Sequence, residues 1–331
     1  MRVIHLPTCL LLALSALFVT GCAQHEQLRG VNLLQSARVS LGSELTNHSL
    51  HRVKALGANA VAFIPFFRQE SIVATEVTGL AASDFAALQR AIRWARWSGL
   101  RVIVKPQILV ADSWAGEVAP ENWQQWFDSY GGELMRIAAL CQGEGVEILV
   151  IGTELNHSVT QPYWHELIRQ VRAEFKGQLS YAAHGVVGLQ KVTFWDELDS
   201  AAVTLYPSLG ENADDSWRQI NDTVSELYMA AMHLPVPVWV AEVGIASRTQ
   251  ARRRPWAWYG LSTEEQGVDL DVQREVIAQW LSALAVDWIE GVMLWSWSSD
   301  PQAGGTQDNG YNIQNKPAER QVMCHWRGRC E

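Results

Sequence analysis

The sequence is poor in charged residues, and the charge that it carries is mainly negative. Asp, Glu, Lys and Arg make up 18% of the 331 residues, below the usual quarter. Residues 1–21 include one basic residue, Arg2, and no acidic one, so the remainder has 25 basic residues (26 minus 1) against 35 acidic ones. This balance disfavours nucleic acid and anionic lipid as partners and suits a neutral or cationic substrate.

Recognisable ligand motifs are also absent. No glycine-rich phosphate-binding loop follows a predicted strand, and no His/Asp cluster has metal-ligand spacing. His325, near Cys324 and Cys330, lacks the further ligands that a zinc site requires. We therefore expect no metal and no nucleotide or other cofactor.

Internal repeats, low-complexity segments and linker-like segments are missing as well, which favours one large domain. Hydrophobic residues make up 48% of the chain, enough for an extensive core, and 16 residues are Trp. Most of these indoles should be structural, but such an excess also suits stacking against the apolar faces of sugar rings.

The N-terminal apolar segment, residues 10–19, is too short to span a membrane and is typical of a signal peptide. Val19-Thr20-Gly21-Cys22 follows it and resembles a bacterial lipobox, in which the Cys is lipidated and becomes the new N-terminus. An ordinary secretory signal with an incidental Cys is the alternative interpretation. A lipid anchor would attach the protein to a membrane without a spanning helix.

The lipobox interpretation sets the expected domain boundaries. We expect a lipoprotein signal peptide at residues 1–21, a short tether at 22–28 and one folded domain at 29–331. Ala23 follows Cys22 where an Asp would indicate inner-membrane retention. The expected location is therefore the outer membrane, facing the periplasm or the cell surface.

Cysteine is scarce, with five residues in the chain. Cys9 would leave with the signal peptide, and Cys22 would be lipidated. Cys141 lies in an apolar, helix-like stretch and is predicted to be a buried free thiol. Cys324 and Cys330 are close in sequence and are a possible disulfide in an oxidising compartment.

Two apolar runs end in a glutamate. Residues 146–153 lead to Glu154, and residues 237–241 lead to Glu242. Runs rich in Val and Ile with turn residues at both ends are typical of strands buried on both faces. A lone Glu at such a position is more often a loop residue, but two of them in a parallel barrel would face one pocket. Two carboxylates flanking a sugar bond are the usual catalytic groups of glycoside hydrolysis.

The whole chain alternates between strand-like and helix-like segments. The predicted strands are Gly30–Leu34, Ala60–Phe66, Arg101–Gln107, Val146–Thr153, Gln178–His184, Ala201–Tyr206, Pro237–Glu242 and Gly291–Trp297. The predicted helices are Ser83–Trp97, Trp123–Cys141, Gln161–Phe175, Asp214–Met232 and Val268–Ala285. Eight such units predict a (β/α)₈ TIM barrel as a single domain. Gly57, Gly99 and Gly145 are predicted helix C-caps before strands two, three and four.

Polar and aromatic residues gather at the predicted carboxyl ends of the strands and in the loops that follow them, as a polysaccharide-binding site requires. The candidate substrate-binding residues are Asn32, Lys105, Gln107, Trp114, His184, Trp256, Trp258, Trp295 and Trp297.

The chain resembles glycoside hydrolase family 113 from about Arg29 to about Trp326. The resemblance rests on the order and spacing of several short segments: residues 29–32, 100–106, 151–155, 179–183, 194–196, 241–244, 255–258 and 315–318. It implies a retaining (β/α)₈ glycosidase that acts on β-mannan.

The resemblance implies a role for each carboxylate. Glu154 would be the acid/base and Glu242 the nucleophile, with the two carboxyl groups about 5–5.5 Å apart. Glu154 would need a raised pKa to be protonated at neutral pH. Tyr206 would orient Glu242, and Trp295 or Trp297 would form the floor of the subsite where the sugar ring distorts.

Three positions depart from the family pattern. Thr153 stands where many related barrels have Asn, Gln107 where the family tends to have His, and His184-Gly185 where it tends to have Asn-Trp. The reaction type therefore carries over more safely than mannan as the substrate. The run Arg252-Arg253-Arg254 could favour an anionic sugar or could be a solvated loop.

The sequence thus predicts a glycoside hydrolase whose partners are a polysaccharide or oligosaccharide and, through its lipid, a membrane. The alternative within enzymes is a glycosidase or transglycosylase that acts on an exopolysaccharide or cell-wall glycan. The alternative of another class is an inactive carbohydrate-binding lipoprotein, which the presence of both glutamates disfavours.

Overall fold

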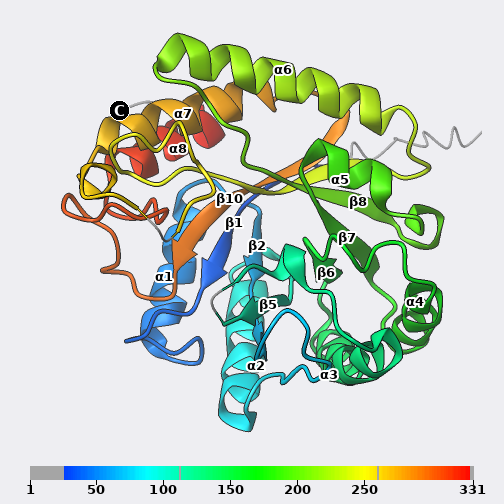
Figure 1. Ribbon diagram of the computed structural model, residues 1–331. Helices are drawn as coiled ribbons and strands as arrows, with labels where there is room; N and C mark the ends of the chain where they lie inside the picture. Colours follow the sequence, from blue (N-terminus) through cyan, green and yellow to red (C-terminus); the bar gives the residue numbers. More distant parts are fainter. Residues whose placement is uncertain (1–25, 112, 259–260, 329–331) are drawn as a thin grey trace, which may run out of the picture.

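The structure is a computed structural model that describes residues 26–111, 113–258 and 261–328. Eight parallel strands close into a barrel in the order β1-β10-β9-β8-β7-β6-β4-β2, with helices around the outside (Figure 1). The (β/α)₈ prediction is therefore confirmed. The barrel strands are β1 (Leu28–Leu34), β2 (Ala60–Phe63), β4 (Arg101–Val104), β6 (Ile148–Thr153), β7 (Gln178–His184), β8 (Ser200–Leu205), β9 (Val238–Val243) and β10 (Ile289–Ser298).

The strands are apolar on both faces because each face is buried. Inside the barrel, small residues such as Ala62, Ala182 and Ala202 pack around the large ring of Trp239. Outside it, residues such as Val61 and Leu149 pack against the helices. This double burial explains why the strand sequences are continuous hydrophobic runs and not alternating ones.

Eight α-helices lie in the described part of the chain. They are α1 (Glu44–Ala55), α2 (Ala82–Trp97), α3 (Trp123–Glu144), α4 (Tyr163–Glu174), α5 (Gly185–Lys191), α6 (Ala213–Ala231), α7 (Leu270–Ala283) and α8 (Pro317–Arg327). The five predicted helices correspond to α2, α3, α4, α6 and α7. The sequence pattern did not single out α1, α5 or α8: α5 has only 7 residues, and α1 and α8 are rich in polar residues.

Two prolines shorten predicted strands. The prediction ran strands two and three through Pro65 and Pro106, but the barrel strands β2 and β4 end before them. The chain then forms a separate two-stranded parallel sheet from β3 (Phe66–Gln69) and β5 (Gln107–Val110). Proline lacks the N–H that would continue a ladder, so the chain leaves the barrel there. Gln107 consequently starts a new strand beyond the barrel mouth.

Three glycines lie where helices α1, α2 and α3 end and the chain turns into the next barrel strand. Gly57, Gly99 and Gly145 have φ angles of 93°, 72° and 63°. Glycine adopts this left-handed conformation without a steric penalty. Gly145 is the C-cap of α3, as predicted, whereas Gly57 and Gly99 directly follow the C-caps Leu56 and Ser98 of α1 and α2.

The cysteine predictions have separate outcomes. Cys141 is a buried free thiol, as predicted. Cys324, on α8, is disulfide-bonded, whereas Cys330, its predicted partner, lies outside the described residues. The predicted signal peptide and Cys22 also lie outside them. Within the described residues, no helix combines the length and apolarity that a membrane crossing requires.

Candidate active site

Glu154 follows β6 in a conformation that few non-glycine residues adopt. Its φ angle is 57°, and such a left-handed conformation costs on the order of 1–3 kcal/mol. Neighbouring β7 holds this turn, since the Glu154 N–H donates to the Ala182 carbonyl at 2.8 Å and the Tyr181 hydroxyl accepts from the Leu155 N–H at 3.0 Å. The strained turn places the carboxyl group over the barrel mouth.

Three side chains contact the Glu154 carboxyl group. His184 Nδ1 lies 3.0 Å from Oε1, the Thr204 hydroxyl donates to Oε1, and Trp114 Nε1 donates to Oε2 at 2.9 Å. Burial raises the pKa of Glu154, but these hydrogen bonds and the charge of His184 outweigh burial and hold that pKa below its ordinary value. The direction is opposite to the raised pKa expected from the sequence.

Glu242 lies within β9 and is 4% exposed. Lys105 and Gln107 donate to its Oε1, and the Tyr206 hydroxyl donates to Oε2 at 3.1 Å. Burial raises the pKa of Glu242, and the charge of Glu154 raises it further, while Lys105 opposes both effects without cancelling them. Burial also raises the pKa of Tyr206, which keeps its hydroxyl a donor.

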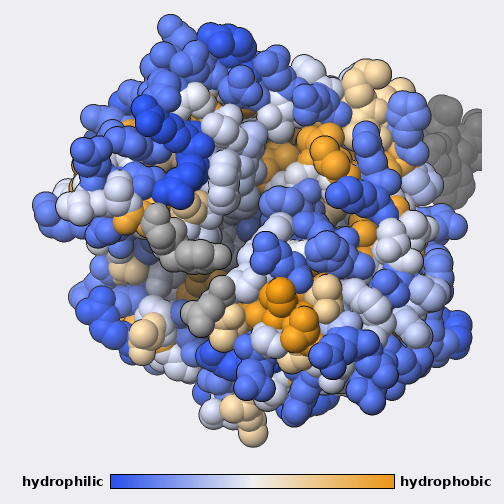
Figure 2. Space-filling view, in the orientation of Figure 1, coloured by the Kyte–Doolittle hydropathy of each residue, from blue (hydrophilic) through white to orange (hydrophobic). Residues whose placement is uncertain are grey.

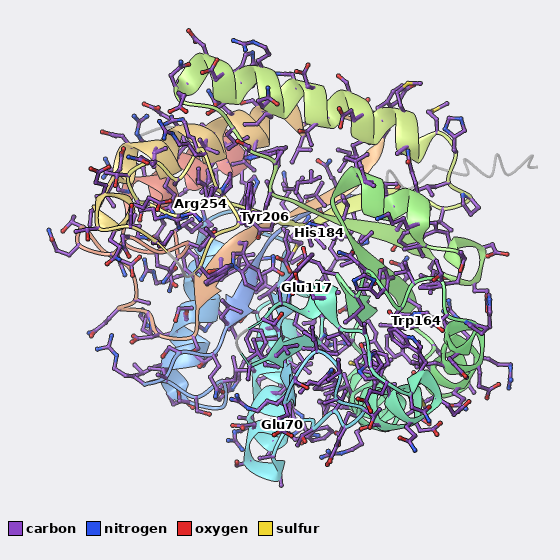
Figure 3. The ribbon with its side chains drawn as sticks, viewed as in Figure 1. Glu70, Glu117, Trp164, His184, Tyr206 and Arg254 are labelled. Carbon is purple, nitrogen blue, oxygen red and sulfur yellow. The ribbon has the colours of Figure 1, made fainter. Side chains whose placement is uncertain are left out.

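The strand register brings the two carboxylates to one place. His184 pairs with Thr204 across β7 and β8, and Thr204 pairs with Glu242 across β8 and β9. Figure 3 shows His184 and Tyr206 close to each other over the centre of the barrel. Figure 2 shows a hollow in the surface at the same place, bordered by both hydrophilic and hydrophobic residues.

Lys105 contacts the protein and not the solvent. Its side chain is fully buried, forms an ion pair with Glu242, and places Nζ 5.2 Å from the ring centroid of Trp295. Burial lowers the pKa of Lys105, and the charge of Glu242 opposes this shift. The prediction that Lys105 binds substrate is therefore corrected to a contact with Glu242.

Asn32 and Trp297 also differ from the prediction. Asn32 is fully buried and donates to the Ala241 carbonyl at 2.9 Å and the Leu294 carbonyl at 3.3 Å. Trp297 is buried in the outer core and donates from Nε1 to Ser49 of α1 at 2.8 Å. Residues two apart on a strand normally face the same side of the sheet, as Trp295 and Trp297 would. Here the consecutive residues Asn32 and Leu33 of β1 pair with Trp295 and Trp297, so the register shifts between them. The two indoles therefore lie in different cores, Trp295 inside the barrel and Trp297 outside it. Neither Asn32 nor Trp297 is placed to contact a glycan.

An aromatic group lies beside Glu242. Trp295 is 4% exposed, and the ring of Trp258 meets it edge-on at 6.0 Å. Trp258 also stacks on Tyr311 at 4.5 Å and remains 58% exposed. Trp256 is 48% exposed. Trp256 and Trp258 are thus available to a ligand, as the prediction requires.

The arginine run is ion-paired. Arg252 pairs with Glu275 at 2.8 Å, and Arg253 pairs with Glu211 at 2.7 Å. Arg254 pairs with Glu265 at 2.6 Å. Hydrogen bonds from Ser262 and Arg254 lower the pKa of Glu265 to about 2. The run is partly neutralised, which favours the solvated-loop interpretation over an anionic sugar site.

Sequence reasoning missed Thr204 and Tyr311. Thr204 precedes Tyr206 by two residues within the predicted strand Ala201–Tyr206, whose alternation would place both side chains on the same face, and this spacing could have revealed Thr204. Tyr311 lies in a loop after β10, and its contact with Trp258 depends on tertiary structure alone. Among the described residues, no cluster of three or more His, Cys, Asp or Glu side chains could hold a metal ion.

A closed parallel barrel with two carboxylates and aromatic rings at the carboxyl ends of its strands is the architecture of a glycosidase. The profile of Glycoside Hydrolase Family 113 matches residues 34–316 of the sequence. The chain belongs to this family and is a glycoside hydrolase.

Solved structures share the fold. A complex structure of a GH113 β-1,4-mannanase is 22% identical, with a TM-score of 0.81, and the match covers 92% of this chain and 100% of that one. The GH113 β-mannanase AaManA from Alicyclobacillus acidocaldarius is 23% identical, with a TM-score of 0.79 over 91% and 97% of the two chains. A GH5_18 protein from Streptomyces cattleya is 16% identical, with a TM-score of 0.64 over 92% and 81%. A comparison with curated protein sequences returns no match.

Proposed function

We propose that this glycoside hydrolase cleaves β-mannan by a retaining mechanism in two steps. The observation that carries the proposal is the pair of glutamates at the barrel mouth, each with its own set of hydrogen-bond donors. Glu154 acts as the acid/base, and Glu242 acts as the nucleophile. Two carboxylates with different environments are suited to two different roles.

In the first step, a Glu242 oxygen forms a bond to the anomeric carbon as the glycosidic bond breaks. Glu154 gives its proton to the departing oxygen. In the second step, Glu154 takes a proton from water, the water oxygen attacks the anomeric carbon, and Glu242 leaves as a carboxylate. The overall change consumes one water and regenerates both groups.

The residues around Glu242 prepare it for attack. Tyr206 holds Oε2, while Lys105 and Gln107 hold Oε1. The positive charge of Lys105 favours the ionised form that the nucleophile requires. Trp295 and Trp258 offer apolar surface for the sugar bound next to Glu242.

A neutral glycan fits the charges of the site. The three consecutive arginines are ion-paired with Glu275, Glu211 and Glu265. Two of the similar structures are described as mannanases. These observations favour β-mannan over a uronic-acid polymer.

The test measures reducing sugar released from β-mannan, glucomannan, β-glucan, chitosan and a uronic-acid polymer. We expect wild type to act on β-mannan, and Glu242→Ala to lose activity on the order of 10⁴-fold or more. Glu154→Gln should lose activity on mannan because Gln cannot supply a proton.

The outcomes separate the competing functions. Activity on another polymer alone would retain the mechanism and replace the substrate, as an exopolysaccharide or cell-wall enzyme would require. Binding to a glycan without turnover by a folded wild type would favour the carbohydrate-binding alternative. Full activity of Glu242→Ala would refute the assignment of the nucleophile.

We also propose that the protein is a lipoprotein of the outer membrane, anchored through Cys22. The support is the lipobox-like segment at residues 19–22, after the apolar segment at residues 10–19, and Ala23 after the cysteine. β1 starts at Leu28, six residues after Cys22. The tether would therefore hold the barrel within roughly 20 Å of the lipid, at about 3.3–3.6 Å per extended residue.

A further inference from the structure

We propose that His184 is a positioning residue that shares one proton with Glu154, so that it sets the upper pH limit at which Glu154 acts as an acid. The inference rests on the proposed role of Glu154 as the acid/base. It assigns to His184 a function beyond substrate contact.

Of the three side-chain contacts of Glu154, only the one with His184 joins two groups that can exchange a proton. The indole of Trp114 can only donate to Oε2, and the Thr204 hydroxyl does not titrate near neutral pH. His184 Nδ1, 3.0 Å from Oε1, can either donate or accept. A proton between these two atoms can therefore belong to either residue.

The position of the imidazole is fixed from several sides. His184 is the last residue of β7 and pairs with Thr204 of β8. Its ring meets the Trp114 ring at a centroid distance of 4.6 Å and an interplanar angle of 60°. The Trp114 ring in turn packs over Gly116, where a Cβ atom would lie 2.2 Å from it. One tryptophan thus contacts both members of the pair.

Charges from neighbouring elements act on the same pair. Burial lowers the pKa of His184, but the hydrogen bond and negative charge of Glu154 outweigh burial, and the net pKa is raised. Glu242 of β9 adds to the rise, and Lys191 of α5 opposes it. Lys105, which directly follows β4, and Glu242 also interact electrostatically with Glu154. The raised pKa of His184 and the lowered pKa of Glu154 describe one proton that stays mainly on the imidazole.

The shared proton supports both steps of the reaction. With one proton in the pair, the forms His⁺–Glu⁻ and His–GluH have equal charge and interconvert by transfer along the hydrogen bond. Glu154 gives this proton to the departing oxygen, which leaves the pair with neutral His184 and ionised Glu154. Attack by water in the second step returns one proton to Glu154, and thereby to the pair.

The pair should retain its proton to higher pH than a lone glutamate would. In wild type, the proton is lost as pH rises through the raised pKa of His184, which lies above 6.5. In His184→Asn, an amide can still donate to Oε1 but holds no titratable proton. In this variant Glu154 alone holds the proton and loses it as pH rises through its own pKa. The basic limb of the pH profile of kcat/KM should therefore move to lower pH by about one unit or more.

The experiment compares two substrates across pH. With a mannan oligosaccharide, His184→Asn should show the shifted basic limb. With a dinitrophenyl β-mannoside, whose leaving group needs no proton, the pH dependence of kcat/KM should show no such shift relative to wild type. Imidazole added to His184→Ala should restore activity at the basic limb, since the His184 side chain is 42% exposed.

Thr204→Val is the matched control. It removes a hydrogen bond to the same oxygen but no titratable group, so its basic limb should not move to lower pH. Circular dichroism and thermal unfolding would establish that each variant is folded.

Two results would overturn the inference: an unshifted basic limb in His184→Asn, or an equal loss on both substrates at every pH, which indicates a purely structural role. Failure of the proposed function gives a different result. Wild type would then be inactive on both substrates, or Glu154→Gln would be as active as wild type on the oligosaccharide.

Discussion

At the residue scale, the environment of each glutamate matters more than its presence. Glu154 accepts hydrogen bonds from an indole and a hydroxyl and lies 3.0 Å from an imidazole nitrogen, whereas Glu242 contacts a buried ammonium group. The same functional group therefore has a lowered pKa in one position and a raised pKa in the other. The residue type alone could not predict the directions of these two pKa shifts, because each shift depends on the hydrogen-bond donors and charges that the fold places beside the carboxyl group.

Lys105 should control the acid limb of activity. In the proposed mechanism Glu242 is the nucleophile and must be ionised, so activity should be lost as pH falls through the pKa of Glu242, which is raised above 4.5. Lys105→Met removes the cation that opposes this rise, and a buried carboxylate without a partner tends to take up a proton. We expect the acid limb of kcat/KM to move to higher pH by about one unit or more.

Lys316→Met is the control for this prediction. Lys316 is also a buried lysine, but it pairs with Asp308 at 2.6 Å and with Ser247 at 2.8 Å. Its replacement should lower stability and leave the acid limb in place. An unmoved acid limb in folded Lys105→Met would contradict the assigned role of Lys105.

At the element scale, close contacts between strand ends fix the geometry of the site. Gly244 directly follows β9, and a Cβ atom there would lie 2.1 Å from the Trp295 carbonyl oxygen of β10. Gly152 of β6 is similarly close to the ring of Tyr181, at 2.8 Å. These glycines allow the neighbouring elements to approach next to Glu242 and Glu154.

Gly244→Ala should destabilise the protein by about 1–3 kcal/mol, because backbone must move to relieve the overlap. Chemical denaturation measures the free energy of unfolding. Activity should fall as well, since Trp295 and Glu242 both lie beside the displaced segment.

Gly132→Ala is the matched control. Gly132 lies inside α3, and apart from the helix's own backbone and its two chain neighbours no atom lies within 4 Å of an added Cβ. Alanine should stabilise this helix by roughly 0.5–1 kcal/mol. Equal stability of wild type and Gly244→Ala would show that β9 and β10 can separate without penalty.

At the scale of the whole molecule, we expect the barrel to function independently of the proposed lipid anchor. Cys22 precedes the first strand, and the carboxylates lie at the carboxyl ends of the strands, opposite the end where the tether enters. Cys22→Ser should therefore move the protein from the membrane fraction to the soluble fraction. Its specific activity on a soluble glycan should stay within about twofold of wild type, because the substitution lies outside the folded barrel.

Fractionation and mass spectrometry of the mature N-terminus check this prediction. Wild type should carry a lipid on Cys22, and Cys22→Ser should carry none. An unmodified wild-type protein cleaved elsewhere would favour the ordinary secretory signal.

The sequence by itself determined the architecture and the two carboxylates. Eight apolar runs alternating with helical segments can bury their faces only as parallel strands covered by helices, and Glu154 and Glu242 each lie at the end of such a run. Helix ends at Gly57, Gly99 and Gly145 were also predictable, because a left-handed residue has a strong sequence preference. Each of these features is set by residues that are close together in the sequence.

Only the tertiary structure decided what each polar side chain contacts. Lys105 could have faced a substrate but pairs with Glu242, and Trp297 could have faced the barrel mouth but packs on α1. Thr204 and His184 meet Glu154 through the register of three strands that are separated in sequence by helices. Register and side-chain direction follow from packing across the whole barrel, so no local pattern in the sequence specifies them.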